Sequence, residues 1–436
     1  MRHVWRAALL SAAVLVCQSA AAATASAIGQ PDVCKKDCQY SSINAAIAAA
    51  GTGATITVGK GTYVENVVVD KPLTIEGSGK RTVIEPAVSN PVCSGGSLCG
   101  GAASNIVLVE ANDVTVTNLK LEGANPSLSG GVVVGGKDID ARNGIITNHE
   151  VGTYEDLTVS KVIVDDVYLR GIYDSTGSFD FNHDAVSNVQ GEEESIAMFA
   201  YYGPGTMDDN TVSDANDAIS ANWSKGIEFA GNTVKSSGSG IHTDNNGGAG
   251  GSADVITDNK ISDCSENGYG IFVFVPYVSA TVSDNTIKGC YIGLAAFGGA
   301  VSGQGPTFSG NTVDGAGAQT TDPAGSYGVY LTTDQLGYEF GDLTADLSGN
   351  LIEHNATGLF VTQTEPTPGQ PAGGQATVTA HGNAFKHNPG GAKGGPGTVV
   401  EAQENWWGCG QGPNNSPKCD PASGTVAYTP WLTAMP

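Results

Sequence analysis

A short phrase recurs along the second half of the chain: Asn, then any residue, then Val, Ile or another apolar residue. Successive asparagines are 22, 27, 26, 26, 39, 33 and 22 residues apart, and Asn182 lies 28 residues before the first. The two long gaps contain polar or Pro- and Gly-rich insertions at 314–326 and 364–374. A repeat of this length predicts a solenoid, in which each coil packs on its neighbours. The asparagines are Asn210, Asn232, Asn259, Asn285, Asn311, Asn350, Asn383 and Asn405.

A second phrase, a glycine followed by an apolar residue, occurs within the repeats, as in Gly240-Ile241 and Gly270-Ile271. Within the repeats, no window of helical length shows a 3.6-residue apolar stripe, so we predict two short β segments per repeat. Segments this short must stack on the next coil to bury their apolar side. The sequence therefore predicts an all-β protein, a right-handed parallel β-helix of roughly a dozen coils. At each bend, we expect the Asn to adopt the left-handed conformation and to stack its amide on the next coil.

The two ends of the chain differ from the repeats. Residues 42–50 place four apolar side chains on one helical face, which is typical of a short helix that covers the first coil. Aromatic residues after Asn405 are expected to cover the last coil. The predicted organisation is a signal peptide at 1–27, an N-terminal cap at 28–54, the β-helix at 55–405 and a C-terminal cap at 406–436.

The first residues carry two arginines and a run of small and apolar residues that ends at Ala25-Ser26-Ala27, the pattern of a cleaved secretory signal. We therefore expect a secreted or periplasmic protein. No other stretch approaches the roughly 18 unbroken apolar residues of a membrane span. The net charge is −24, and −26 once Arg2 and Arg6 are removed. Nucleic acid and anionic membrane are therefore poor partners, and a monomer is expected.

Eight cysteines follow the predicted leader, and an even number in an exported chain predicts disulfides. Cys264 and Cys290 each lie five residues after a repeat asparagine, so they occupy the same position in adjacent coils. Parallel strands are about 4.8 Å apart, which is within the Cα separation that a disulfide requires. The remaining pairs are expected to be local: Cys34–Cys38, Cys93–Cys99 and Cys409–Cys419.

Two segments resemble known proteins. The opening SINAAIAAAGTGATITVGKGTYVENVVVDKPLTIEGSGKRTVIE is similar to the first coils of the pectin-lyase-like superfamily, and NWWGCGQGP with a final YTPWL resembles the closing cap of bacterial secreted β-helix repeat proteins. The resemblance implies the fold. The superfamily includes pectate lyases, pectin methylesterases, polygalacturonases, uronan epimerases, phage depolymerases and noncatalytic surface or accessory proteins, so the resemblance does not select a function.

The second strand of each repeat carries an outward column of side chains, because alternate strand residues point to opposite faces. The first outward position reads Tyr173, Ala197, Ser220, His242, Phe272, Ala295, Tyr330 and Phe360, and the second, two residues later, reads Ser175, Phe199, Asn222, Asp244, Phe274 and Phe297. Large exposed apolar area marks a ligand or partner site, and aromatic rings suit the apolar faces of sugars. An alternative is that loops such as 245–254 or 314–326 fold over these rings and bury them. The predicted substrate-binding residues are Tyr173, Phe199, Ser220, Asn222, Phe272, Phe274, Phe297 and Tyr330.

His242 and Asp244 are the titratable pair in these columns, and strand rise places them about 7 Å apart on one face. A histidine can exchange protons near neutral pH, and Asp244 could orient it, act as a general acid or hold a metal. A hydrolase also requires a second carboxylate, for which Asp217, one coil below, is the candidate. The predicted catalytic residues are therefore His242, Asp244 and Asp217.

Two further groups of polar residues carry weaker signals. The group Asp180, His183 and Asp184 lies at a bend beside Asn182. The segment 244–254 offers oxygen ligands for Ca²⁺, although its spacing matches no defined loop. A calcium requirement, and the identity of any metal ligands, are left open.

Three functions remain compatible with the sequence. The leading hypothesis is a secreted protein that binds, and cleaves or modifies, an extended polysaccharide. Such an enzyme would be a polysaccharide lyase, a glycoside hydrolase or an epimerase; a lyase would depend on Lys225, Lys235 or a metal, because few arginines remain. The second hypothesis is a noncatalytic surface or matrix-binding protein. The third is a periplasmic accessory protein similar to the β-helix partner of nitrous-oxide reductase, for which four methionines and no clustered histidines are a poor copper-binding set.

Overall fold

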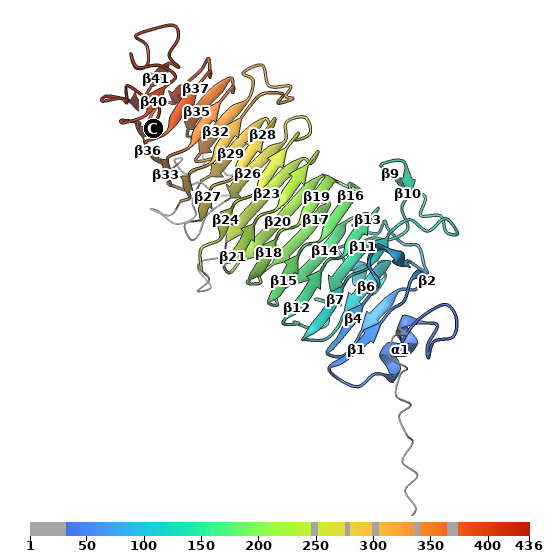
Figure 1. The fold of residues 1–436 in the computed structure, drawn as a ribbon. Coiled ribbons are helices and arrows are strands. Elements are labelled where there is room, and N and C mark those ends of the chain that lie inside the picture. Colours follow the sequence, from blue (N-terminus) through green and yellow to red (C-terminus); the bar gives the residue numbers. More distant parts are fainter. Residues whose placement is uncertain (1–31, 246–251, 275–279, 299–304, 335–340, 364–373) are drawn as a thin grey trace, which may run out of the picture. The chain divides into compact units, whose positions relative to one another are not determined.

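The computed structural model describes residues 32–245, 252–274, 280–298, 305–334, 341–363 and 374–436. The predicted signal peptide lies outside these residues. From Pro31 onward the chain forms one compact unit. Three long parallel sheets run through it, and each coil contributes one strand to each sheet (Figure 1). The fold is therefore the predicted right-handed parallel β-helix.

Among the described residues, sheet 1 contains 14 strands and sheets 2 and 3 contain 13 each. The strands of sheet 1 are β1 Ala54–Thr57, β4 Leu73–Glu76, β7 Val114–Thr117, β12 Leu157–Ser160, β15 Phe179–Asn182, β18 Gly205–Asp208, β21 Ile227–Ala230, β24 Val255–Thr257, β27 Thr281–Ser283, β30 Thr307–Ser309, β33 Leu343–Ser348, β36 Ala376–His381, β39 Val399–Glu401 and β42 Val426–Ala427. Those of sheet 2 are β2 Gly61–Val64, β5 Thr82–Glu85, β8 Lys120–Glu122, β13 Ile163–Asp165, β16 Ala185–Val189, β19 Thr211–Ala215, β22 Thr233–Lys235, β25 Lys260–Ser262, β28 Thr286–Lys288, β31 Thr312–Asp314, β34 Leu351–Glu353, β37 Ala384–Lys386 and β40 Trp406–Trp407. Those of sheet 3 are β3 Val67–Val69, β6 Asn105–Val109, β11 Asn143–Thr147, β14 Arg170–Ser175, β17 Ile196–Tyr201, β20 Asp217–Ser224, β23 Ser239–Asn245, β26 Tyr269–Phe274, β29 Ile292–Phe297, β32 Tyr327–Thr332, β35 Thr357–Thr362, β38 Ala392–Gly394 and β41 Ala422–Gly424.

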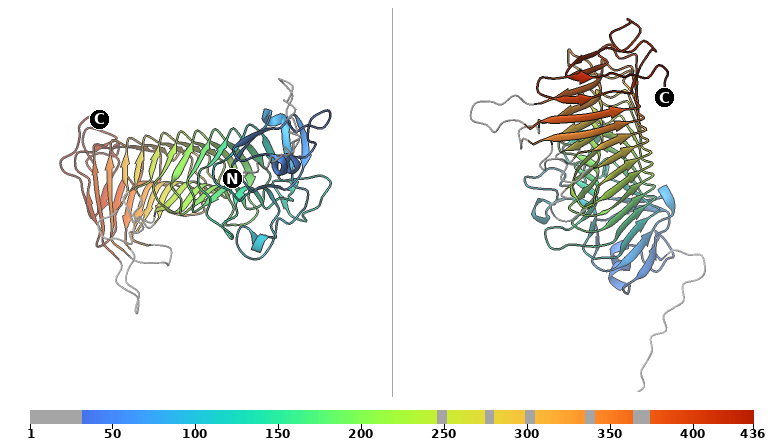
Figure 2. Two further views of the ribbon diagram at one scale, coloured as in Figure 1. Left: turned by 90° about the horizontal axis from the view of Figure 1, so that it is seen from below. Right: turned by 90° about the vertical axis from the view of Figure 1, so that its left-hand side faces the viewer.

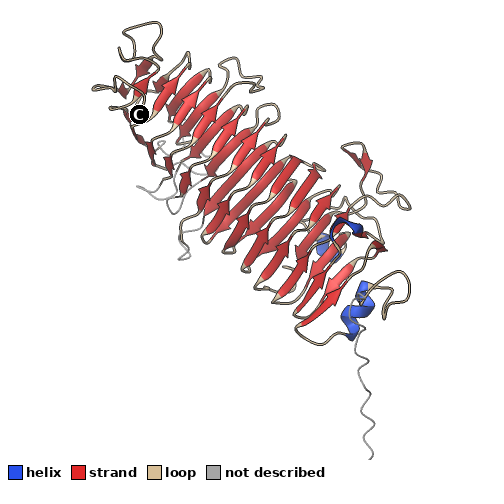
Figure 3. Ribbon diagram, viewed as in Figure 1, coloured by secondary structure: helices blue, strands red, loops and turns tan. Residues whose placement is uncertain are grey.

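Few elements lie outside these sheets (Figure 3). Helix α1 Ile43–Ala49 precedes β1, and the 3₁₀ turns η1 Gly79–Arg81 and η2 Cys99–Gly101 are short. A small antiparallel pair joins β9 Val133–Val134 to β10 Lys137–Asp138. Among the described residues, no helix is long and apolar enough to cross a membrane.

Each coil contains three strands, so the prediction of two is wrong. The missed strand precedes the asparagine and belongs to sheet 1, as in β24, β27 and β30. These strands are three residues long with one buried residue. Three residues are too few for an alternating pattern to be recognised in the sequence.

The repeat asparagines form a continuous buried ladder. The side-chain Oδ1 of each accepts the backbone N–H of the ladder residue one coil earlier, at 2.7–3.0 Å between N and O from Asn210 to Asn405. From Asn232 to Asn383, each Nδ2 also donates to the next Oδ1. The ladder begins at Asp184 and not at Asn182, because Asp184 N–H donates to Asn210 Oδ1. The stacking prediction is therefore confirmed with a corrected first member.

The prediction that the asparagine of each bend adopts the left-handed conformation is wrong. The residue before the asparagine adopts it. Asp209, Asp258, Asp284 and Glu404 have φ of 55–57°, and glycines with positive φ occupy the same place in other coils. This explains the Asp-Asn and Gly-Asn pairs of the repeat, since Gly and Asp tolerate the left-handed region better than most residues. The asparagine is left free to accept and donate hydrogen bonds along the stack.

The four disulfides found within the described segments are the four pairs expected from the sequence. Cys264 and Cys290 have Cα atoms 4.8 Å apart and join adjacent coils. Figure 2 shows the regular stacking of the coils along which these residues lie. Strands β40, β41 and β42 continue the three sheets into the segment expected as the C-terminal cap.

Candidate functional site

The outward columns of sheet 3 form the candidate site. Neighbouring strands pair Tyr173 with Phe199, Phe199 with Ser220, Ser220 with His242 and His242 with Phe272. The column then continues through Ala295, Tyr330 and Phe360. The inward column beside it contains apolar residues such as Ile172, Ile241 and Ile271, all fully buried.

The predicted alignment is wrong at one coil. Met198 pairs with Ile172, so Phe199, and not Ala197, belongs to the first outward column. Tyr201 takes the second position, opposite Ser175 and Asn222. In this coil Ala197 occupies the position directly before the inward residue, where many other coils have a glycine, and for that reason the sequence alignment slipped by two residues.

Strands β20 and β23 make a polar gap in this column, with Asp217, Ser220 and Asn222 on β20 and Ser239, His242 and Asp244 on β23. Ser220 Oγ lies 3.0 Å from His242 Nδ1, and Asp217 Oδ2 lies 3.8 Å from the same nitrogen. The imidazole stacks on Phe272, with 4.2 Å between ring centroids. The structure therefore brings together His242 and Asp217, as predicted, and positions the ring between a hydroxyl, a carboxylate and an aromatic face.

Four buried polar atoms of the gap have no hydrogen-bond partner among the described residues: His242 Nε2, Asp217 Oδ1, Asn222 Oδ1 and Ser239 Oγ. Each such atom costs roughly 1–3 kcal/mol relative to a paired one. Buried polar atoms are nearly always satisfied in folded proteins. Four in one patch therefore indicate a place that water or a ligand completes.

Asp244 lies beside this gap but contacts different groups from those expected. The backbone N–H of Trp223 donates to Asp244 Oδ1. Burial raises the pKa of Asp244 to about 6, an effect that His242 and the Trp223 N–H partly offset. The register between β20 and β23 shifts after Ala221, so Asp244 does not face Asn222 directly. Asp244 and His242 are thus close enough to interact electrostatically, as the effect of His242 on the pKa of Asp244 shows, but the hydrogen bond that Asp244 accepts comes from Trp223.

Two aromatic residues beside Asp244 were missed by the sequence analysis. Trp223 has a φ of 56° and Tyr202 a φ of 65°, an uncommon backbone conformation for large side chains. Their rings stack with 5.7 Å between centroids, and Trp223 is 37% exposed. Trp223 and Tyr202 each directly follow an outward strand residue, at the bend where the alternating pattern ends. In the sequence, the tryptophan directly after Asn222 was the one sign of an aromatic residue at this bend.

Aromatic clusters flank the gap on both sides. The cluster on the N-terminal side contains Leu98, Ile146, Tyr173, Ile196 and Phe199. The one on the C-terminal side contains Ile292, Ala295, Phe297 and Tyr327, with Tyr269, Phe272, Phe274, Tyr291, Tyr330 and Phe360 packed against them.

Several of the predicted binding rings are not open to solvent. Tyr173, Phe199 and Phe297 are only 5%, 6% and 4% exposed, so the expectation that these three form an open face is wrong. Phe272, Phe274 and Tyr330 are half-buried. The alternative of covering insertions is therefore partly correct, since Asp322 of the 314–326 insertion accepts a hydrogen bond from Tyr291 at 2.7 Å.

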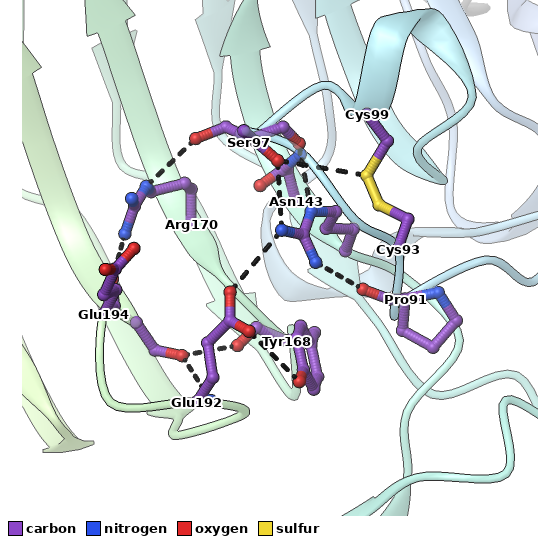
Figure 4. A network of polar contacts seen from close by, with 12 residues as sticks. Pro91, Cys93, Ser97, Cys99, Asn143, Tyr168, Arg170, Glu192 and Glu194 are labelled. Atoms are coloured by element: carbon purple, nitrogen blue, oxygen red, sulfur yellow. Dashed lines mark hydrogen bonds and ion pairs between the residues drawn. A yellow bond between two sulfur atoms is a disulfide. The ribbon is translucent and has the colours of Figure 1, made fainter.

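A covering loop at 86–104, which the sequence analysis did not identify, lies over the N-terminal cluster. Figure 4 shows Pro91, Ser97 and the Cys93–Cys99 disulfide of this loop beside Asn143, Tyr168 and Arg170. Arg142 donates to the carbonyls of Pro91 at 2.8 Å, Gly96 at 3.1 Å and Ser97 at 3.2 Å. Leu98 then packs among the aromatic residues.

Arg170 is held beneath the same loop. Its Nε lies 3.3 Å from Ser97 Oγ, and its guanidinium lies 4.9 Å from the Phe199 ring centroid. Burial lowers the pKa of Arg170 to about 10, although Tyr173 and Asp217 oppose this effect. The side chain remains a cation, but it is 8% exposed and cannot reach an extended ligand on the outer face.

The weaker polar group does not form a site. Asp184 is buried as the first member of the ladder, and burial raises its pKa well above the usual range. His183 lies at the surface, 3.7 Å from Asp209 Oδ2. In the proposed calcium segment, Asp254 is buried and accepts from Ser224 Oγ at 2.6 Å, while residues 246–251 lie outside the described residues.

Comparison with known structures agrees with the fold. The chain is similar to the A-module of mannuronan C-5 epimerase AlgE6 from Azotobacter vinelandii, with a TM-score of 0.53, 16% identity, 89% of this chain and 93% of that chain. It is similar to the AlgE4 A-module of the same organism, with a TM-score of 0.55, 14% identity and coverage of 82% and 93%. The catalytic domain of a GH87 alpha-1,3-glucanase gives a TM-score of 0.57, 13% identity and coverage of 82% and 66%.

Among curated proteins, no sequence matches significantly. A family model does match, over residues 97–293 and 182–388, and its description is "Periplasmic copper-binding protein (NosD)". Together these segments span more than half of the chain and include all of the polar gap. The chain therefore belongs to the NosD family of right-handed parallel β-helix proteins.

Proposed function

We propose that the protein is an exported polysaccharide-binding protein that binds an extended glycan along sheet 3 and acts on it at the polar gap of β20 and β23. The observation that carries this proposal is the set of four unpartnered buried polar atoms between two aromatic clusters. Ligand sites typically combine an apolar, aromatic lining with a few polar groups that fix orientation. Sugar hydroxyls would supply the missing hydrogen bonds, and the half-buried rings beyond the gap would contact the sugar faces.

His242 is the residue best placed to exchange a proton with a bound sugar. Its Nδ1 faces Ser220 and Asp217, and its buried Nε2 has no partner among the described residues, so a sugar hydroxyl could complete its hydrogen bonding. Asp217 can hold the ring in one orientation and stabilise its protonated form. Asp244, with its pKa raised to about 6 by burial, is a second group that can carry a proton near neutral pH.

A neutral glycan fits this surface better than a polyanionic one. The chain carries a net charge of −24, and Arg170, the arginine nearest the gap, is buried under the covering loop. A uronate carboxylate would therefore meet repulsion without a nearby free guanidinium, unless a cation such as Ca²⁺ bridged the two charges.

The proposal is tested with a panel of neutral and anionic oligosaccharides, at low and high salt and with and without Ca²⁺, by measuring binding and analysing products. We expect salt-independent binding of a neutral glycan together with product formation. Binding without any product would favour the noncatalytic surface protein, and preference for a polyanion in the absence of Ca²⁺ would contradict the proposed ligand.

Replacing His242 by Ala is the matching mutation. We expect turnover of the identified glycan to be abolished, because the proton-exchanging group is lost. The side chain is 14% exposed and stacks on Phe272, so a stability loss of about 1 kcal/mol is also expected. His183→Ala, an exposed histidine outside sheet 3, is the control. Full turnover by the His242 variant would contradict the assigned role.

Export and the family description also bear on function. Four disulfides favour an oxidising compartment, in agreement with a periplasmic or secreted location. The family description names copper, but the soft ligands of the described residues are not arranged for it: the eight cysteines are paired in disulfides, Met198 and Met207 are fully buried in the core, and only Met435, next to the last residue, is exposed. A copper role in this chain would therefore depend on imidazole.

A further inference from the structure

At the C-terminal part of sheet 2, on the two successive coils of β34 and β37, two histidines are brought together. His354 follows β34 and His387 follows β37, each at a bend with φ of 56° and 58°. His387 Nδ1 lies 3.2 Å from His354 Nε2, and the ring centroids are 5.2 Å apart. The two histidines do not stand out in the sequence, because they are 33 residues apart and become neighbours only when the coils stack.

We propose that His354 and His387 form a binding site for a divalent transition-metal ion that prefers imidazole, such as Zn²⁺, Cu²⁺ or Ni²⁺. Two nitrogen ligands of a tetrahedral zinc ion, each about 2.0–2.1 Å from the metal, are about 3.3 Å apart. The two ring nitrogens are already close to this separation. An ion between them would replace the single shared proton of a histidine–histidine hydrogen bond.

The surroundings of His354 match those of a metal-binding histidine. Its Nδ1 lies 3.1 Å from Asp314 Oδ1, so that nitrogen donates to the carboxylate and Nε2 presents its lone pair toward His387. A carboxylate on the far ring nitrogen is the usual partner of a metal-bound histidine, because it fixes the tautomer and the ring orientation. Asp314 is therefore a positioning residue.

The neighbouring charges favour imidazole ligands over carboxylate ligands. Lys386 Nζ lies 2.8 Å from Glu353 Oε2, and Lys288 Nζ lies 3.4 Å from Asp314 Oδ2. Both carboxylates are thus already engaged by ammonium groups, and together the four charges cancel. Hard cations such as Ca²⁺ and Mg²⁺ require several free oxygen ligands, so the site selects borderline transition metals.

The site is accessible from solvent and separate from sheet 3. The His354 side chain is 41% exposed, so a metal ion has an entry path. The pair uses two protein ligands and leaves positions for water or for a group from a partner. The inference does not depend on the proposed glycan site, because β34 and β37 belong to sheet 2.

The test is calorimetric titration of the full mature chain, without an affinity tag, with Zn²⁺, and electron paramagnetic resonance of the Cu²⁺ complex. We expect one saturable site and nitrogen hyperfine coupling from two imidazoles. His354→Asn and His387→Asn should each abolish saturable binding, since Asn tolerates the left-handed bend but supplies no imidazole. Asp314→Ala should weaken binding about 10–100-fold.

His183→Asn is the matched control, because His183 is also exposed at a left-handed bend beside a carboxylate but has no neighbouring imidazole. It should leave binding unchanged, and melting curves should show that every variant is folded. The proposal is overturned if the wild-type chain shows no saturable binding. It is equally overturned if both histidine variants bind as tightly as wild type, or if Ca²⁺ binds as tightly as Zn²⁺.

Discussion

Asn285 is a ladder residue whose loss should strongly destabilise the β-helix. It is 1% exposed. Its Oδ1 accepts from the backbone N–H and the Nδ2 of Asn259, both at 2.9 Å, and its Nδ2 donates to Ile256 O and Asn311 Oδ1, also at 2.9 Å. In Asn285→Ala the Asn259 N–H loses its recorded acceptor, whereas Asn259 Nδ2 keeps the carbonyls of Phe229 and Thr257.

The expected loss of unfolding free energy is roughly 2–4 kcal/mol. An orphaned buried N–H costs about 1–3 kcal/mol, and each of the other lost hydrogen bonds contributes about 0.5 kcal/mol or more. This is a large part of the stability of a typical domain, about 5–15 kcal/mol. The measurement is the midpoint of urea unfolding, followed by far-UV circular dichroism and tryptophan fluorescence.

Asp284→Asn is the matched control, because Asp284 is exposed at the adjacent left-handed bend, where Asn is tolerated. It should change stability by no more than about 0.5 kcal/mol. If Asn285→Ala unfolds at the same midpoint as this control, the ladder does not contribute as the geometry implies, and the reasoning is refuted.

Three further predictions concern the site, the coil disulfide and the covering loop. Burial raises the pKa of Asp244 to about 6, so the folded state retains that proton more strongly than the unfolded state and stability falls as pH rises from about 4 to 6. Asp244→Asn should therefore raise stability at pH 7 by up to about 3 kcal/mol, with no gain at pH 4, in unfolding measured across that range. Replacing Cys264 and Cys290 by Ser opens a 26-residue loop and should cost about 3 kcal/mol, read from the unfolding midpoint; an unchanged midpoint would argue against the disulfide. Arg142→Leu removes the donor that holds the loop carbonyls, so limited proteolysis should cut within 91–101 sooner than in wild type; equal cleavage rates would show that the loop is held by other contacts.

The fold could be predicted from the sequence because the spacing of the repeat asparagines shows which residues of adjacent coils lie next to each other. The spacing of the asparagines placed Cys264 and Cys290 one above the other, and the structure joins them. The bends could not be assigned to the correct residue, because Asp-Asn pairs place two candidates for the left-handed conformation side by side. Sheet 1 was missed where its strands have one buried residue each.

Part of the candidate site could also be predicted, but from the alternation of strand residues and not from the repeat spacing. Strand alternation identified Ser220, His242 and Phe272 as neighbours on one face, since that pattern depends only on local residues. The burial of Tyr173 could not be predicted in the same way, because the loop that buries it comes from two coils earlier in the sequence. The pairing of His354 with His387 likewise depends on stacking across an insertion.

The proposed binding of a glycan over the polar gap of sheet 3 is tested by hydroxyl-radical footprinting with a bound neutral oligosaccharide. Bound sugar should slow the oxidation of Trp223, His242 and Phe272, while His183, at the bend after β15, should be oxidised at the same rate with and without sugar. Protection confined to residues outside sheet 3, or no difference at Trp223 and His242 under saturating sugar, would contradict the account.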